Sequence, residues 1–287
     1  MQVGIITKHV WRNAANMPVE RLHVSFCKRV LGVHSKATNV AVMGELGKYP
    51  LLVKILCQKL KFWKRVIGGE HCNTYLELAS KEMLAIDHSV RSSWLSTLKK
   101  YVSTLADNSF LNFMISEKNG MFKNKLKESY RTYWRSQLGY DRGDIGKLVL
   151  YRRIKNNYIF EAYLDILRNS DLRKCMTELR ISCHALEIER GRYMKTPINE
   201  RLCRFCYEQG NNIVEDEAHF LLKCPQYSRE RDALYRTVSA ECPQFTSLSD
   251  LNKVRFMLTA EGDVCLALSQ FCHRSMVLRK ANGQGVL

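Results

Sequence analysis

The sequence predicts a mainly α-helical protein. Apolar residues recur at spacings of three and four positions, the period of a helix with one buried side. Only 5 prolines and 15 glycines occur in 287 residues, so few positions would stop a helix. With 46% hydrophobic and 25% charged residues, the chain can bury a core, which excludes a disordered tail and a disulfide-stapled miniprotein. We expect a helical bundle, a small separate module and C-terminal helices.

Two helices are expected in the first 70 residues. The first has an apolar face and ends at Gly32, since glycine commonly follows the last turn. Pro50 is a favoured first-turn residue and Gly68-Gly69 is a stop, which predicts the second helix between them. The apolar faces carry Val19, Leu22, Phe26, Val30 and Leu31 in the first helix, and Leu52, Ile55, Leu56, Trp63, Val66 and Ile67 in the second.

Four further helices are expected, with one apolar and basic run before the last of them. Thr74 and Glu77 form a capping box at the start of one helix. The helical period continues from residue 94 to 105, with a break at Asn108-Ser109, and again from 121 to 138, where the aromatic residues fit a buried side better than a base-stacking surface. An apolar and basic run, 148 to 167, follows Gly139 and Gly143. Ser170 is a plausible N-cap for a helix that ends near Gly191.

The positive charge is concentrated in one part of the chain. Lys and Arg number 45 against 28 Asp and Glu, a formal charge of +17. The segment 118–155 alone holds 11 basic residues against Glu128, Asp141 and Asp144. Such a density repels itself unless an anion binds, and nucleic acid is the commonest partner. The alternative is a solvated helix face that only aids solubility. The candidate phosphate contacts are Lys123, Lys125, Lys127, Arg131, Arg135, Arg152, Arg153 and Lys155.

A group of three cysteines and one histidine carries the clearest chemistry. Cys203, Cys206, His219 and Cys224 have the pattern Cys-x2-Cys-x12-His-x4-Cys. Two thiolates three positions apart can hold one cation from a tight turn, and the later pair can complete a tetrahedron. Chance gives about 0.4 accidental Cys-x2-Cys pairs in such a chain, but the correctly spaced pair after it lowers that rate to well under roughly one in a hundred. The pattern predicts one zinc ion.

This zinc is expected to be structural. Four protein ligands leave no coordination position for a reacting water molecule, so catalysis at the metal is excluded. Residues 200–228 are then expected to unfold without the metal. The carboxylates Glu215, Asp216 and Glu217 are explained by the dipole of a helix that begins there. Arg204 and Phe205, between the first two ligands, are candidates to meet a phosphate and a base, although Phe205 is equally well explained as core.

The remaining patterns exclude several classes of protein. No apolar run reaches the roughly 18 to 20 residues of a membrane span. The first residues lack a secretion signal, so an intracellular protein of the nucleus or cytoplasm is expected. The other cysteines are then interpreted as buried thiols, including Cys265 and Cys272 near His273, and Cys183-His184 as packing that joins the basic region to the zinc module. No small-molecule substrate is indicated, because phosphate-loop and hydrolase motifs are absent.

Several segments resemble the C-terminal region of reverse transcriptases from LINE-like, non-LTR retrotransposons. The similarity spans most of residues 20–235 and is most specific in its last two motifs. The matching segments are FCKRVLGV at 26–33, GELGKYPL at 44–51, RISCHALEIERGRY at 180–193, and CRFC at 203–206 followed by EDEAHFLLKCPQY at 215–227.

The resemblance implies a helical thumb, a helical linker and a CCHC zinc knuckle that handles template RNA and target DNA. Residues 1–70 would be the thumb-like segment, 71–195 the basic linker, 196–240 the zinc-binding module and 241–287 the C-terminal helices and tail. The aromatic-x-Asp-Asp motif of the polymerase is absent, as are the palm, fingers and endonuclease. No two-metal site for phosphoryl transfer is therefore expected, and the chain looks like part of a truncated element.

We therefore expect a non-catalytic protein that binds RNA, DNA or both and holds one zinc ion. Two alternatives stay open. In the first, the zinc closes a module that is purely structural or binds other proteins, and the nearly neutral last 87 residues suit such a module. The chain may also act in an active reverse transcriptase when it is joined to the missing domains.

Overall fold

The computed structural model describes residues 2–67, 74–89, 93–106, 119–139 and 146–281. Within these ranges the chain is α-helical and has no β-strand, which confirms the mainly α prediction. Two isolated antiparallel bridges, Leu46 with Phe160 and Leu202 with Val214, are the β pairing in the described ranges. Among the helices described, none has the length and apolar character needed to cross a membrane.

The chain forms two compact units. Unit 1 consists of Met1–Val24 and Tyr49–Gln137, and unit 2 of Ser25–Lys48 and Leu138–Leu287. The chain thus leaves unit 1, enters unit 2, returns and leaves again. These crossing points differ from the boundaries expected near residues 70, 195 and 240, because helices distant in sequence share a core.

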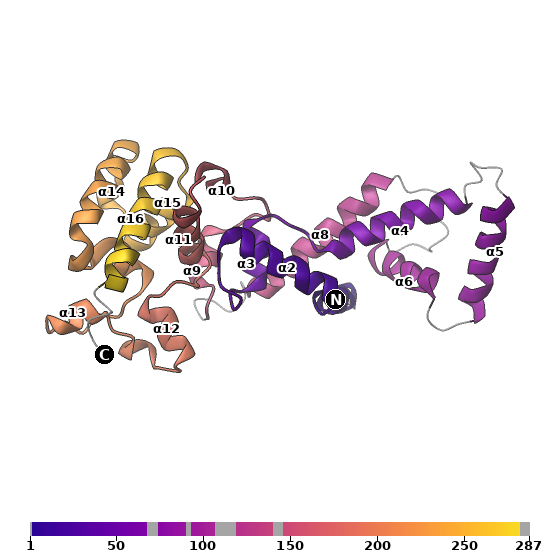
Figure 1. Ribbon diagram of the computed structural model, residues 1–287, viewed down its shortest axis with the longest axis horizontal. Helices are drawn as coiled ribbons and strands as arrows, with labels where there is room; N and C mark the ends of the chain where they lie inside the picture. The colour runs from indigo at the N-terminus through magenta and orange to yellow at the C-terminus, as the bar shows by residue number, and fades with distance from the viewer. Residues whose placement is uncertain (1, 68–73, 90–92, 107–118, 140–145, 282–287) are drawn as a thin grey trace. The chain divides into compact units, whose positions relative to one another are not determined.

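Unit 1 is a set of packed helices (Figure 1). Helix α6 contacts α1, α4 and α5, and α4 also contacts α5. As predicted, the apolar side of α8 (Asn119–Leu138), the last helix of unit 1, is buried, with Trp134 and Leu126 fully covered. Trp11 of the first helix donates from Nε1 to Ser129 Oγ at 3.0 Å. The helices are α1 (Gln2–Ala15), α4 (Leu51–Ile67), α5 (Thr74–Ser89), α6 (Trp94–Ala106) and α8 (Asn119–Leu138), with α2 (Pro18–Leu31) running from unit 1 into unit 2.

The start of α2 and the C-terminal ends of α2 and α8 have the residues that commonly mark helix ends. Pro18 starts α2, and Gly32 follows that helix with φ of +70°, the left-handed conformation that glycine adopts without strain. Gly139 has the same φ and follows α8. The other predicted stops, Gly68-Gly69, Asn108-Ser109 and Gly143, and the side chain of Thr74 in its capping box, lie outside the described residues.

Helix α2 departs from the expectation. Its apolar face was predicted from the helical period, and such a face is usually buried. Only Leu31 of that face is buried, whereas Leu22 is 71% exposed, Phe26 63% and Val30 45%. The side that packs inward instead carries Glu20 and Cys27. Glu20 is held there because its carboxylate accepts the N–H of Leu52, at the start of α4, at 2.8 Å.

Unit 2 is built around its last helix. Helix α16 packs against α14, α11 and α15 (Figure 1). The α-helices of the unit are α3 (Asn39–Glu45), α9 (Val149–Ile154), α10 (Tyr163–Ile166), α11 (Ser170–Arg180), α12 (Glu187–Tyr193), α13 (Arg204–Glu208), α14 (Ser228–Glu241), α15 (Asp250–Thr259) and α16 (Gly262–Ala281).

The segment 170–191 is broken, although its pattern predicts one helix. Before it, the run 148–167 contains the short helices α9 and α10. The helix expected to end near Gly191 stops at Arg180, and α12 begins seven residues later. The break shows no Gly or Pro; Ser182 takes the left-handed conformation itself, with φ of 52°. The N-cap of α11 is Asn169, not Ser170, because the Asn169 side chain accepts the N–H groups of Asp171 and Leu172 at 2.9 and 3.2 Å.

A buried ionic cluster explains where α11 ends. Arg180 is 1% exposed and donates from Nε to Glu45 at 2.8 Å and from Nη2 to Glu161 at 2.6 Å. A third bond reaches the carbonyl of Leu258. Because removal of one member would leave buried charges unpaired, this cluster fixes α3, the segment after α9, and α11 relative to one another.

Candidate metal centre

The first two cysteines lie on a tight hairpin. Leu202 bridges Val214, and the N–H of Cys203 donates to the Ile213 carbonyl at 2.8 Å. Cys203 then precedes the short helix α13, which contains Cys206. Gly210 turns the chain back with φ of +81°. The hairpin therefore directs both thiols to the same side.

The second pair comes from one wide helical turn. The N–H of Cys224 donates to the carbonyl of His219 at 2.8 Å, a bond between residues five apart, as in a π-helix. At the start of this turn, Asp216 accepts the N–H of His219 through Oδ1 at 2.7 Å. The Asp216 carboxylate thus caps the turn, and His219 and Cys224 meet at its ends.

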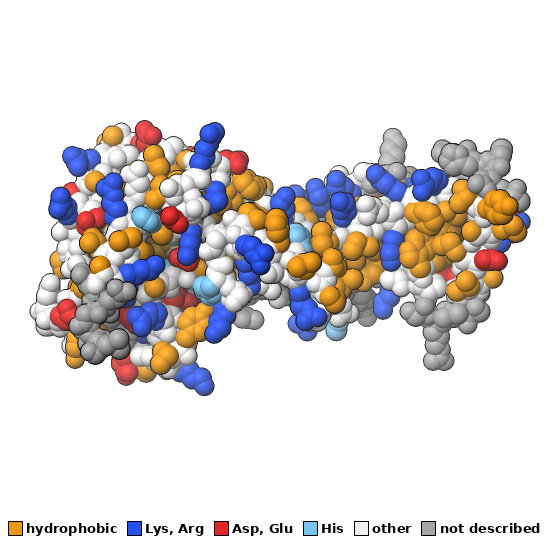
Figure 2. Space-filling view, viewed as in Figure 1, with side chains coloured by type: hydrophobic (Ala, Val, Ile, Leu, Met, Phe, Trp, Pro, Cys, Tyr) orange, Lys and Arg blue, Asp and Glu red, His pale blue; other side chains and the backbone are white. Residues whose placement is uncertain are grey.

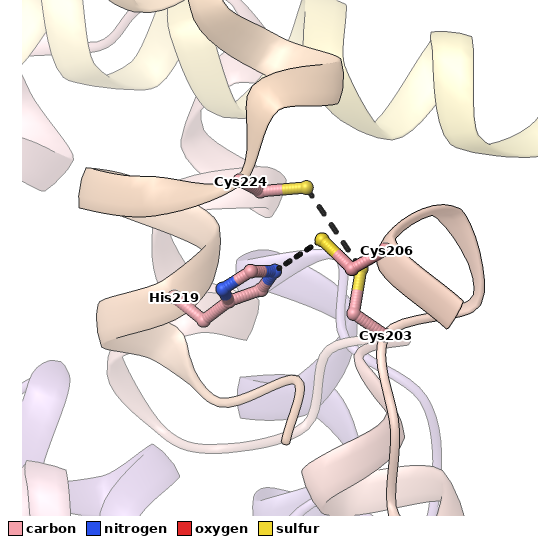
Figure 3. Close-up of side chains that lie close together, drawn as sticks. All are labelled: Cys203, Cys206, His219 and Cys224. Atoms are coloured by element: carbon pink, nitrogen blue, oxygen red, sulfur yellow. Dashed lines mark hydrogen bonds between the residues drawn. The ribbon is translucent and has the colours of Figure 1, made fainter. Parts of the chain in front are cut away.

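The four side chains converge as the spacing predicted (Figure 3). All four are buried, and their ligand atoms lie within 4.8 Å of one another. Cys203 Sγ is 3.8 Å from Cys224 Sγ, and Cys206 Sγ is 3.4 Å from His219 Nε2. Tetrahedral zinc, with bonds of about 2.3 Å to sulfur and 2.0 Å to nitrogen, separates two sulfurs by about 3.8 Å and sulfur from nitrogen by about 3.5 Å. The donor set and its spacing are compatible with one zinc ion.

The thiols of Cys203 and Cys224 lie close enough together to form a hydrogen bond. A hydrogen bond with Cys224 lowers the pKa of Cys203 to about 3, and the same bond raises the pKa of Cys224. Burial raises the pKa of Cys206. Several thiolates in one buried place repel one another, and a divalent cation relieves that repulsion while it replaces the protons.

Arg231 of α14 supports the turn that carries His219 and Cys224. The guanidinium is buried, with 7% of the residue exposed, and donates to the carbonyls of Leu221 at 2.9 Å, Phe220 at 3.2 Å and Cys224 at 2.8 Å. The last carbonyls of a helical turn lack N–H donors within the turn, so the guanidinium supplies donors to these three. Sequence reasoning missed Arg231, because a lone arginine in a helix carries no local signal of this role.

The three carboxylates before His219 do not act together at a helix terminus, which corrects the dipole explanation for two of them. Glu215 is fully buried and accepts from Arg279 of α16, with Nη2 to Oε2 at 2.7 Å, and from the N–H of Glu187 at 2.8 Å. Burial raises the pKa of Glu215 to about 7, against the opposing effect of Arg279. Glu217 contacts His184 Nε2 at 3.1 Å. Only Asp216 caps the turn.

The contact between His184 and Glu217 agrees with the interpretation that Cys183-His184 joins the preceding region to the zinc module. His184 is 6% exposed and lies between α11 and α12. Cys265 and Cys272 are buried in the core of unit 2 on α16, as interpreted from the sequence. Among the described residues, the four ligands above are the one group of His, Cys, Asp and Glu with metal-binding geometry.

The predicted basic residues of α8 remain at the surface of unit 1. Lys123 and Arg135 are exposed, and Lys125, Lys127 and Arg131 are half-buried. We call these five residues the α8 basic face. Figure 2 shows Lys and Arg side chains gathered where α4 and α8 lie, with few acidic ones.

The structure corrects part of the remaining list of phosphate contacts. Lys155 is 1% exposed and pairs with Glu161, and its Nζ donates to the Ile159 carbonyl at 2.7 Å, so its charge is used inside unit 2. Arg152 is 9% exposed and donates to the Leu138 carbonyl at 3.3 Å. Arg153 is half-buried and reaches a cavity described below.

Arg204 and Phe205, between the first two cysteines, make their contacts inside unit 2, which corrects their assignment as nucleic-acid contacts. Phe205 is 6% exposed and packs edge-on against Tyr227, with ring centroids 5.9 Å apart, so it belongs to the core of the module. The guanidinium of Arg204 lies 4.5 Å from the Phe205 ring centroid and donates to the carbonyl of Arg279. Arg204 thus attaches the hairpin to α16, and Phe205 packs it against Tyr227.

Comparison with known protein families, curated proteins and solved structures gave no match to this chain. The fold and the metal-compatible cluster therefore stand on their own geometry.

Proposed function

We propose that this chain is a non-catalytic nucleic-acid-binding protein. One structural zinc ion bound by Cys203, Cys206, His219 and Cys224 stabilises unit 2, and the α8 basic face of unit 1 contacts phosphates. The resemblance to the C-terminal region of non-LTR reverse transcriptases supports this proposal, as does the absence of an aromatic-x-Asp-Asp motif from the sequence.

The α8 basic face is the observation that carries the proposal. Lys123, Lys127 and Arg131 are spaced four residues apart and form one row, about 12 Å long at 1.5 Å per residue. Lys127 Nζ and the Arg131 guanidinium lie 5.1 and 5.9 Å from the ring centroid of Tyr49, and Arg131 Nε donates to its hydroxyl at 2.8 Å. This aromatic contact orders two of the cations at the surface.

Helix α4 adds to the same positive region. The pKa of Cys57 is raised by burial, and the neighbouring charges of Lys123, Lys61 and Lys127 oppose that rise. Lysines from two helices therefore lie near enough to the Cys57 thiol to act on its charge. Unit 1 as a whole has 18 Lys and Arg against 8 Asp and Glu in the sequence. Phosphate is the ligand that such a surface attracts most strongly.

The salt dependence of binding tests this assignment. If the α8 basic face neutralises about five phosphates, the affinity for single-stranded RNA or DNA should fall with a log–log salt slope of about −3.5 to −4.5. Changing all five residues to glutamine should flatten the slope to near zero. Fluorescence anisotropy with labelled oligonucleotides measures both.

A matched control removes five charges elsewhere. Arg229, Arg236, Lys253, Arg255 and Arg274 of unit 2 are exposed or half-buried, and their change to glutamine should leave most of the slope intact. An equal loss in both variants would mean that only net charge matters, and an unchanged slope in the α8 variant would exclude the face.

A protein-interaction module is the second candidate, and the exposed apolar side of α2 favours it. Leu22, Phe26 and Val30 project from a helix whose inward side is already packed. Partners retained in a pull-down after nuclease treatment, and lost in Phe26→Ser, would support this function. Primer extension by the chain alone would instead reveal the polymerase activity that the proposal excludes.

A further inference from the structure

Unit 2 contains a cavity of about 440 Å³ that the phosphate-binding proposal does not use. It lies among α9, α12, α15 and the segment before His219, and this size falls within the usual range of ligand sites. Leu150 and Val254 contribute apolar wall. Lys147, Arg153, Glu189 and Arg192 contribute charge.

The wall of this cavity holds two polar atoms that the described residues do not satisfy. Glu189 is 2% exposed, and its Oε1 accepts from Arg192 Nη2 at 2.8 Å. Glu189 Oε2 and Arg192 Nε are both buried and have no hydrogen-bond partner among the residues that the structure describes. Buried polar groups are nearly always paired, so an unused acceptor beside an unused donor indicates a missing partner with the complementary pair.

Three other polar groups of the cavity, Arg201, Asp216 and Glu217, already have hydrogen-bond partners. Arg201 donates to the carbonyls of Thr196 and Ile188 at 3.0 and 2.8 Å. Asp216 caps the turn of the metal centre and Glu217 contacts His184. Glu189 and Arg192 thus carry the buried polar atoms that are left to recognise a ligand, and the cations Lys147 and Arg153 also line the cavity.

Two cations line the cavity, and an exposed aromatic ring lies close to one of them. Lys147 lines the cavity, and its Nζ also lies 5.9 Å from the ring centroid of Tyr193, which is 53% exposed. Arg153 lines it from α9. Apolar walls, a paired donor and acceptor, cations and an exposed ring together fit a nucleotide: a flat base with a hydrogen-bonding edge, attached to a phosphate.

We propose that this cavity receives one unpaired nucleotide, with the base edge on Glu189 and Arg192 and the phosphate on Lys147 and Arg153. The inference rests on the proposed function and deepens it, because it adds recognition of a base to the contact with the phosphate backbone. A free nucleotide and an unpaired nucleotide of a strand present the same base and phosphate to this cavity.

Binding of the four ribonucleoside 5′-monophosphates, compared with ribose 5-phosphate, tests this proposal on the zinc-loaded full chain by titration calorimetry. At least one base should bind about tenfold more tightly than ribose 5-phosphate, the effect expected of a hydrogen bond to a charged group. Glu189→Gln should change the order of preference among the bases, because the amide presents N–H donors where the carboxylate presented only acceptors. Glu208→Gln, at an exposed position of α13, should leave the order of preference unchanged.

The outcomes separate this inference from the proposed function. Equal binding of all five ligands, or an order of bases that Glu189→Gln leaves unchanged, would overturn the cavity assignment. Such a result beside a normal salt slope would leave the α8 basic face standing. Base-selective binding of monophosphates without binding of strands would support the cavity and contradict the function. If Glu189→Gln does not fold, Tyr193→Ala, at an exposed position, should weaken binding of every base but not of ribose 5-phosphate, and no such difference would count against the site.

Discussion

At the scale of single residues, the four side chains of the candidate metal centre were predictable and the residues that support them were not. The spacing of Cys203, Cys206, His219 and Cys224 places two pairs of donors on two tight turns, which is a local property of the sequence. Arg231 and the pairing of Glu215 with Arg279 depend on helices that return from 7 to 64 residues away. No pattern of spacing carries such contacts, so only the packed structure reveals them.

Arg231→Leu is expected to lower the free energy of unfolding of the zinc-loaded protein by roughly 2 to 4 kcal/mol, because it leaves three buried carbonyls without a donor. It should also speed the transfer of zinc to a chelator, since the turn that holds His219 and Cys224 loses its support. Urea unfolding and a chromogenic chelator measure the two effects. Arg236→Leu, at an exposed position of the same helix, is the control. Equal stability of the two variants would show that Arg231 does not hold the turn.

Lys155 shows a second limit of sequence reasoning at this scale. A lysine in a basic run is normally solvated, yet this one neutralises Glu161 inside unit 2. Its pKa is lowered by burial, against the opposing effects of Glu161 and Glu45. The charge pattern counted Lys155 correctly but could not place it, because the acidic partners only meet it through the fold.

At the scale of elements, the helices were predicted better than their interruptions. Helices α4, α6 and α8 begin and end near the expected residues, and α5 begins where expected, because Pro, Gly, the capping box and the apolar period mark them. The end of α11 has no such mark. Arg180 pairs with Glu45 and Glu161, and Ser182 adopts a left-handed conformation that normally favours glycine, at a cost of about 1 to 2 kcal/mol. Tertiary ion pairs therefore outweigh local helix propensity at this break.

The N-cap of α11 gives a direct test at this scale. Asn169→Ala should lower the free energy of unfolding by about 1 kcal/mol, because two backbone N–H groups lose their acceptor. Ser170→Ala should change it by less than about 0.5 kcal/mol, since Ser170 is already the first helical residue. Thermal or urea unfolding compares the two variants. The reverse order would restore the cap that the sequence pattern suggested.

The exposed side of α2 is also a property of the element. The helical period correctly placed Leu22, Phe26 and Val30 on one side, but periodicity does not say which side packs inward. Glu20 turns inward because it accepts the N–H of Leu52, one of the first donors of α4, which has no partner within its own helix. Because the side of α2 that carries Glu20 faces inward, the apolar side of the helix faces solvent.

At the scale of the whole molecule, the α8 basic face and the candidate metal centre fall in different units. The α8 basic face belongs to unit 1, whereas the four candidate metal ligands and the cavity beside α12 belong to unit 2. The sequence indicated this separation through its nearly neutral last 87 residues. It could not indicate that residues 25–48 join unit 2, because the contacts of Glu45 with Arg180 span 135 positions. Loss of phosphate binding and loss of zinc should accordingly be separable by mutation.

The zinc content of the purified chain tests the central claim most directly. Native mass spectrometry should show one zinc ion per chain. His219→Ala should abolish zinc binding together with the protection of residues 200–228 in hydrogen exchange, whereas His273→Ala, at a half-buried position of α16, should keep both. A chain that contains no metal and still protects residues 200–228 as strongly as one supplied with zinc would contradict the account.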